Sequence, residues 1–119
     1  MQFQINRDVL LKSLAIAHNI IERKNTLPIL SNVLLEIKNS KLNIIATDLD
    51  LLFLDEISDF KIEKEGSTTT SATVLYDILK KLPTNTEVSF ALKNENKLNI
   101  SADKSKFNLL CLPVDNFPN

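Results

Sequence analysis

The sequence predicts an α+β domain in which two helices pack on antiparallel sheets and one structural unit occurs twice. The first observation is an internal echo, because residues 38–48 (KNSKLNIIATD) and 93–103 (KNENKLNISAD) are nearly the same segment. The second is a helical period of apolar residues over 7–21 and again over 72–82. The third is strand-like alternation around each helix. The order strand, helix and three strands therefore occurs twice, which indicates an internal duplication.

The first half begins with a short strand and continues directly into a helix. Phe3 and Ile5 alternate with polar residues, which predicts a strand over 2–6. Asn6 can cap the helix predicted over 7–21. Pro28 ends the helical pattern. Asn39 and Ser40 form a tight turn between two strands. The remaining strands of this half are expected at 33–37, 42–46, about 51–57 and from 60 onward.

The second half repeats this order after Gly66, the single glycine, which interrupts the strand pattern. Thr68–Thr70 is expected to be extended because it is β-branched. Ser71 is expected to cap a helix over 72–82, which Pro83 ends. Three further strands are predicted at 88–92, 97–102 and 107–112. Residues 8–14 (DVLLKSL) and 73–79 (TVLYDIL) correspond, so the first half has extra residues in the basic stretch 21–32.

Composition narrows the class of protein. The chain has 119 residues, 44% hydrophobic and 24% charged, which is typical of one globular domain. The net charge of −1 gives no overall indication of nucleic-acid binding, so only a local basic face could bind it. We expect a cytoplasmic protein, because no apolar run approaches a membrane span and no signal peptide begins the chain. The two prolines within 113–119 predict the start of a linker to a further domain.

The sequence offers few candidates for catalysis or metal binding. His18 lies at the end of an apolar helix, and Cys111 alternates with apolar residues on one strand, so both are expected to be structural. One cysteine excludes an intramolecular disulfide and a cysteine zinc site. Asp48 and Asp50 lie in the acidic stretch 47–59, but that stretch lacks the glycine and terminal glutamate of a calcium loop. We therefore predict no enzyme activity and no cofactor.

The cations form a more informative pattern. Lys12 belongs to the polar side of the first helix, which also contains Asp8 and Asn19. If the two helices pack side by side, their polar sides face the same way and gather positive charge on one surface. Such a surface could follow phosphates without reading base sequence, although ordinary solvated charges are the alternative interpretation. The candidate DNA-binding residues are Lys12, Arg23, Lys24, Lys80 and Lys81.

Three spaced motifs resemble a known family. TLPILSN (26–32), TDLDL (47–51) and FNLLCLPVDNFPN (107–119) are similar to the N-terminal domain of the bacterial DNA polymerase III β subunit, the sliding clamp. The resemblance runs from residue 1 to 119. It implies the DNA-clamp fold and the first of three such domains. It also implies a ring of two head-to-tail chains around duplex DNA, with helices lining the hole.

The resemblance implies roles for particular residues. Four positions correspond to the family's contact with the third domain of the neighbouring chain, namely Val74, Ile78, Leu82 and Phe107. The alternative for these four is an ordinary core role. The family usually has arginine and proline just before TLPIL, in a loop that touches DNA, where this chain has Lys24 and Asn25. Charge is kept at Lys24, but the planar guanidinium is lost.

The resemblance also implies partners and a mode of action. The expected partners are duplex DNA, DNA polymerase III and the clamp loader, and the full-length protein is expected to be a homodimer. The family's polymerase-binding pocket lies mainly in the third domain, so residues 1–119 should lack it. The expected function is a non-enzymatic tether that prevents the polymerase from dissociating. Two alternatives remain: a stand-alone α+β protein-interaction module, and a hydrolase that uses Cys111 or the acidic stretch.

Overall fold

The computed structural model describes residues 1–21 and 27–118. The first half contains β1 (Gln2–Asn6), α1 (Arg7–Ile21), a 3-10 turn η1 (Pro28–Ser31), β2 (Asn32–Lys38), β3 (Lys41–Thr47), β4 (Leu52–Ile57) and β5 (Lys61–Lys64). The second half contains β6 (Gly66–Ser71), α2 (Ala72–Lys81), β7 (Glu87–Lys93), β8 (Lys97–Ala102), β9 (Ser105–Leu112) and a 3-10 turn η2 (Val114–Asn116). The predicted α+β class and both helices are confirmed.

Several strands extend one or two residues beyond their predicted ends, and two other boundaries differ in a way that affects the packing. The second helix ends at Lys81, and Leu82 is the extended cap residue, whose N–H donates to the Leu79 carbonyl. Gly66 opens β6 instead of separating two elements, and its φ of 154° suits glycine alone. A Cβ on Gly66 would lie 2.9 Å from the Cβ of Met1, so the N-terminus also requires glycine there.

The strands form one nine-stranded antiparallel arrangement in the order β4-β3-β2-β6-β9-β8-β7-β1-β5. It consists of two sheets that meet at β9, which pairs with β6 in one sheet and with β8 in the other. The first strand of each half pairs with the hairpin of the other half, so β1 pairs with β7 and β6 pairs with β2. The two halves are therefore interlocked, and neither could keep all its strand pairs alone.

The duplicated segments occupy equivalent hairpins. The echoed strands are β3 and β8, and each follows a turn that begins with asparagine. Asn39 and Ser40 have φ values of 55° and 65°, while Asn94 and Glu95 have 54° and 65°. Asparagine tolerates this left-handed region better than most residues, and the hairpin twist requires it. The predicted repeat therefore extends to the backbone of the turns.

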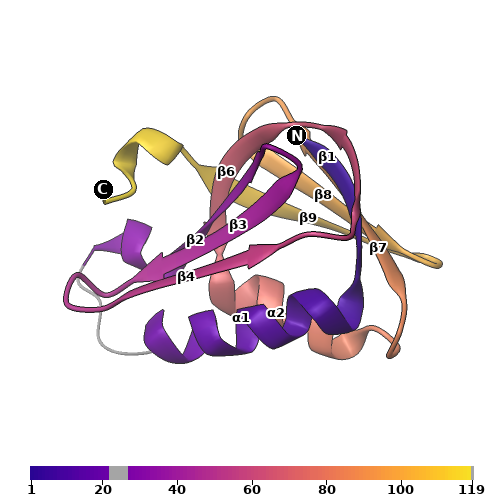
Figure 1. The fold of residues 1–119 in the computed structure, drawn as a ribbon, viewed down its shortest axis with the longest axis horizontal. Coiled ribbons are helices and arrows are strands. Elements are labelled where there is room, and N and C mark those ends of the chain that lie inside the picture. The colour runs from indigo at the N-terminus through magenta and orange to yellow at the C-terminus, as the bar shows by residue number, and fades with distance from the viewer. Residues whose placement is uncertain (22–26, 119) are drawn as a thin grey trace.

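The two helices lie side by side across one face of the sheets (Figure 1). Their apolar sides supply Leu10, Leu14, Leu75 and Leu79, all fully buried. The sheets supply the facing layer, in which the rings of Phe3 and Phe90 stack with centroids 4.7 Å apart. The opposite side of the helix pair faces solvent, which makes it the main surface that the helices offer to a partner.

Threonine hydroxyls join the two sheets where β6 and β9 diverge. These strands form only two residue pairs, at Thr69 and Thr70. Thr69 Oγ1 donates to the Leu112 carbonyl at 2.7 Å, and Thr70 Oγ1 donates to the Leu110 carbonyl at 3.0 Å. These side chains add hydrogen bonds to β9 carbonyls where the backbone pairing between the two strands is short. The run Thr68–Thr70 is thus a junction as well as a strand.

Candidate functional site

The exposed side chains of α1 and α2 form the surface that we call the helix face. Its members are Asp8, Val9, Lys12, Ile16 and Asn19 from α1 and Thr73, Val74, Asp77, Lys80 and Lys81 from α2. The predicted polar side of α1 is confirmed at Asp8, Lys12 and Asn19. It is wider and less polar than predicted, because Val9 and Ile16 are also exposed. The helix face therefore combines cations with separate apolar side chains.

The predicted cations on the helices occupy two parts of this face. Lys12 borders a hollow of about 530 Å³ between α1 and β4, whose lining includes Ile16, Phe53 and Asp55. Lys80 and Lys81 lie in the last turn of α2, where the helix dipole favours positive charge. Arg23 and Lys24 lie outside the described residues. The structure thus brings Lys80 and Lys81 together and leaves Lys12 nearer to β4.

Lys80 is held by neighbours on α2. Its Nζ lies 4.4 Å from the ring centroid of Tyr76, a cation–π contact. It also lies 3.6 Å from Oδ1 of Asp77. The Tyr76 ring in turn stacks on His18 of α1, with centroids 4.6 Å apart and planes 23° apart. His18 therefore contributes to the contact between the helices, as its structural interpretation predicted.

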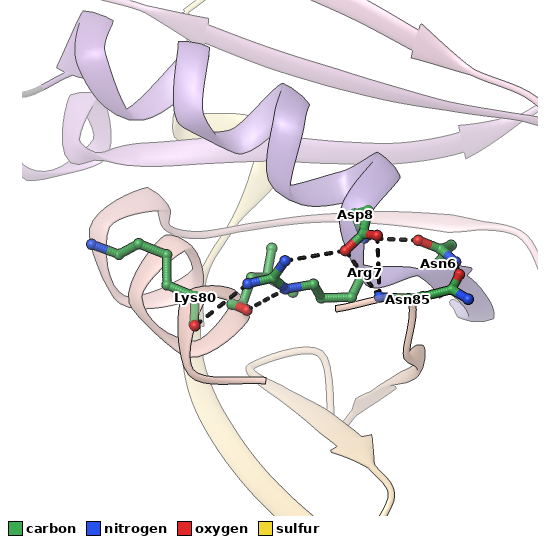
Figure 2. A network of polar contacts seen from close by, with 6 residues as sticks. Asn6, Arg7, Asp8, Lys80 and Asn85 are labelled. Carbon is green, nitrogen blue, oxygen red and sulfur yellow. Dashed lines mark hydrogen bonds and ion pairs between the residues drawn. The ribbon is translucent and has the colours of Figure 1, made fainter. Parts of the chain in front are cut away.

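Arg7 caps the C-terminal end of α2. Its Nε donates to the Leu79 carbonyl at 2.8 Å, and its Nη2 approaches the Lys80 carbonyl at 3.4 Å. These carbonyls belong to the last turn of α2, where intrahelical donors run out. Figure 2 shows the Lys80 carbonyl directed toward Arg7 and the Lys80 ammonium extended away from it. Arg7 thereby fixes the backbone that carries the two terminal lysines.

The start of α1 is tied to the turn that follows α2 (Figure 2). Asn6 Oδ1 accepts from the Asp8 N–H at 2.8 Å, which confirms the predicted cap. Both carboxylate oxygens of Asp8 accept from the Asn85 N–H at 3.1 Å, and one accepts from Arg7 Nη1 at 3.1 Å. The Asn85 amide and, after it, Arg7 lower the pKa of Asp8 from its usual value.

Sequence reasoning missed Arg7 and Asn85. A signal for Arg7 was present, since a cation in the first turn of a helix faces the positive end of the helix dipole. Its placement there indicates that the guanidinium has a partner elsewhere. Asn85 has a φ of 58°, and asparagine in a turn gives no indication of which side chain it will meet.

The four residues that the resemblance assigned to the ring contact lie in different environments. Val74 is 47% exposed, whereas Ile78 and Leu82 are 8% and 5% exposed and belong to the core cluster. Phe107 is partly buried against that core. Residues 105–110 of β9 pair with β8 on one side, and no described strand pairs with their other edge. Val74 and this edge are the most accessible parts of the predicted contact.

The residues considered for catalysis or metal binding have surroundings that favour a structural role. Burial raises the pKa of the Cys111 thiol, which opposes formation of a nucleophilic thiolate. Asp48 Oδ1 accepts from the N–H groups of Asp50 and Leu51, so it closes the turn before β4. Within residues 1–21 and 27–118, no three His, Cys, Asp or Glu side chains gather closely enough to hold a metal ion.

In the part of the chain that the structure describes, no helix combines the length and the apolar character that a membrane span requires.

Comparison with known proteins relates this arrangement to one family. The family described as "DNA polymerase III beta subunit, N-terminal domain" matches residues 1–119. A protein of Caulobacter vibrioides named "Beta sliding clamp" is 41% identical over 119 residues, which is 99% of this chain and 32% of that protein. A protein of the same name from Escherichia coli is 33% identical over 100% of this chain and 32% of its own length.

Solved structures give the same result. The crystal structure of the DNA polymerase III subunit beta from Pseudomonas aeruginosa superposes with a TM-score of 0.94 at 35% identity, covering 100% of this chain and 32% of that one. The chain thus spans about a third of the length of the relatives that it matches. On sequence and on fold, the chain belongs to the family of the DNA polymerase III beta subunit, N-terminal domain.

Proposed function

We propose that this chain is the first of three domains in a ring-shaped sliding clamp, which encircles duplex DNA and tethers the replicative polymerase in the cytoplasm. The observation that carries the proposal is the match of all 119 residues to beta sliding clamps. The clamp performs no chemistry of its own. It raises the length of DNA made per binding event because a closed ring cannot dissociate sideways from the duplex.

The helix face is the proposed DNA-facing surface. Lys12, Lys80 and Lys81 are exposed on it, and lysine meets phosphate as a point charge without base specificity. Arg23 and Lys24 are proposed to add a loop contact. Weak contact suits this role, because the ring must slide while closure retains it on DNA. Each phosphate that a lysine neutralises should contribute about −0.9 to the slope of log affinity against log salt.

The β9 edge is the proposed centre of the head-to-tail contact. An unpaired strand edge offers N–H and C=O groups that a strand of another chain can continue. Val74 and Phe107 are proposed to flank this edge, with Ile78 and Leu82 forming the base of the contact behind them. Residues 113–119 are proposed to begin the link to the second domain. DNA polymerase III and the clamp loader would bind the full-length protein.

Retention on DNA of different topology tests this function. The full-length protein, loaded on nicked circular DNA, should stay bound through gel filtration and should be released when the circle is cut. Equal loss from circular and linear DNA would contradict encirclement.

Lysine substitutions test the proposed surface. Replacing Lys12, Lys24, Lys80 and Lys81 with alanine should weaken duplex binding at low salt and flatten its salt dependence. The matched control replaces four exposed strand lysines, Lys38, Lys61, Lys93 and Lys97. It removes the same charge from the sheets and should leave affinity closer to that of the unchanged protein. Equal effects of the two sets would refute a DNA role for the helix face.

A stand-alone protein-interaction module is the second candidate. The observation that favours it is a group of exposed leucines at and before β4, namely Leu49, Leu51, Leu52 and Leu54. Clustered apolar side chains on a surface are typical of protein contacts. The same experiment separates the candidates, since a module of this kind shows no dependence on DNA topology.

A further inference from the structure

The seam between α1 and α2 contains an aromatic side chain that both helices hold. Tyr76 of α2 is partly buried and packs against the main core. Its ring stacks on His18 of α1 at a centroid distance of 4.6 Å. A ring held in this way keeps its position while exposed side chains around it change rotamers, because its motion would disturb two helices at once.

Lys80 rests on this fixed ring. Tyr76 and Lys80 are four residues apart, so they lie on the same side of α2. Nζ of Lys80 is 4.4 Å from the ring centroid, and Asp77 Oδ1 is 3.6 Å from the same nitrogen. Arg7 meanwhile approaches the Lys80 carbonyl at 3.4 Å. Among the described residues, no ring or carboxylate contact of this kind involves Lys12 or Lys81.

A lysine that is already oriented has an advantage in binding phosphate. A free lysine side chain loses rotamer freedom when its ammonium is fixed against a ligand. The ammonium has three donors, so it can keep the ring beneath it and still donate outward. The side chain of Lys80 is 50% exposed, which leaves room for that contact.

We propose that Tyr76 is a positioning residue that holds the Lys80 ammonium in place for a DNA phosphate, with His18 supporting the ring. This inference rests on the proposed DNA-binding function of the helix face. It assigns Lys80 a stronger contact than Lys12 or Lys81, whose side chains must be ordered when DNA arrives. The competing explanation is that the contact only stabilises α2, as exposed cation–π pairs commonly do.

A double-mutant cycle on the full-length protein separates the two explanations. The variants are Tyr76→Leu, Lys80→Ala, the pair together, and Tyr76→Phe, each titrated against a labelled duplex at low salt. Lys80→Ala should weaken binding about two- to fivefold, the range expected from losing one oriented cation. Tyr76→Leu should weaken it by a similar factor in the presence of Lys80 and have no further effect after Lys80→Ala. Tyr76→Phe keeps the ring face and should bind like the unchanged protein.

Any other result of the double-mutant cycle shows whether the DNA role of Lys80 or the positioning role of Tyr76 is wrong. If Lys80→Ala leaves affinity unchanged, the DNA role of Lys80 in the proposed function fails. If Lys80→Ala weakens binding but Tyr76→Leu does not, or acts equally without Lys80, the positioning role fails and the DNA role stands.

If the Tyr76→Leu protein does not fold, two further measurements still test the proposal. Tyr76→Met fills similar space without a ring and should reproduce the weakening. In the unchanged protein, the side-chain protons of Lys80 should show an upfield ring-current shift by NMR, and the absence of that shift would overturn the proposal.

Discussion

Replacing Arg7 with methionine should destabilise the fold by breaking the cap on α2. Methionine keeps much of the apolar length of arginine and removes the guanidinium. The side chain of Arg7 is only 12% exposed, so water cannot fully replace its bonds. The 2.8 Å bond from Nε to the Leu79 carbonyl is the principal loss. The 3.4 Å approach to the Lys80 carbonyl is near the limit of a hydrogen bond and adds little.

The expected loss follows from these contacts. A hydrogen bond from a charged donor contributes about 1.5–3 kcal/mol. The lower end applies here, because the Leu82 N–H also donates to the Leu79 carbonyl and leaves it partly satisfied. A cation at the end of α2 adds about 0.3–1 kcal/mol, and removing one from the start of α1 returns a similar amount. The net expectation is a loss of about 1.5–2 kcal/mol in the free energy of unfolding.

Urea unfolding measures this loss. With a slope of about 2 kcal/mol per molar, the midpoint should fall by about 0.8–1 M. Lys12→Met is the matched control, because it removes an exposed cation from the same helix and should change stability by less than about 0.5 kcal/mol. Arg7→Lys should lie between the two, since lysine restores the charge without the planar donors. An Arg7→Met midpoint equal to that of Lys12→Met would refute the capping role.

Three further predictions concern buried or titrating side chains. Ser13 Oγ is buried and has no hydrogen-bond partner among the described residues, so Ser13→Ala should stabilise the chain by about 0.5–1 kcal/mol in the same urea assay. Thr70→Val removes the donor to the Leu110 carbonyl with little change of shape, so it should lower the free energy of unfolding by about 1 kcal/mol. The control Thr73→Val lies on the exposed side of α2 and should lower it less. The folded-state pKa of Asp8 lies below its usual 3.8, so its stabilising contribution is present above that value and is lost as pH falls through the lower folded pKa. Acid titration of unfolding should therefore show a shallower loss below about pH 4 for Asp8→Asn than for the unchanged protein.

Local patterns in the sequence predicted the elements well. The helical period of α1 and the alternation of strands such as β3 and β8 reflect burial on one side, which the residue order encodes directly. Turn chemistry was equally informative, since Asn39 and Asn94 both adopt positive φ. Side-chain contacts across long separations were not accessible in this way. The bonds from Arg7 to α2 join residues 72 or more positions apart, and no local rule selects them.

Local sequence patterns also could not predict that the first strand of each half pairs with the hairpin of the other half. A duplication predicts two equivalent units but does not say which hairpin each first strand joins. Exchange of β1 and β6 between the halves satisfies both sheets, while β5 occupies the free side of β1. The burial of Ile78 and Leu82 was not predictable for a similar reason. Their helical spacing predicts a common apolar side, but how much of it the sheets cover depends on the tertiary packing.

Comparison of the two helices indicates where the halves have acquired separate roles. Aligning DVLLKSL with TVLYDIL pairs Leu10 with Leu75, both fully buried, and Val9 with Val74, both 47% exposed. These positions keep the same residue type because the duplicated fold gives them the same surroundings. The next positions differ, and each difference lies within a proposed role. Tyr76 replaces Leu11 and supports Lys80, and Ile78 replaces Ser13 at the base of the proposed ring contact.

This comparison makes the internal duplication a guide to function. Where the fold alone determines a position, the two halves should agree, and where a partner determines it, they are free to diverge. Exchanging Leu11 and Tyr76 between the halves, as the variant Leu11→Tyr with Tyr76→Leu, would keep composition constant. We expect that exchange to preserve the fold and to lose the oriented Lys80, because position 15, four residues after position 11, is an alanine and offers no equivalent cation. Duplex affinity equal to that of the unchanged protein would show that the divergence at this pair has no bearing on DNA.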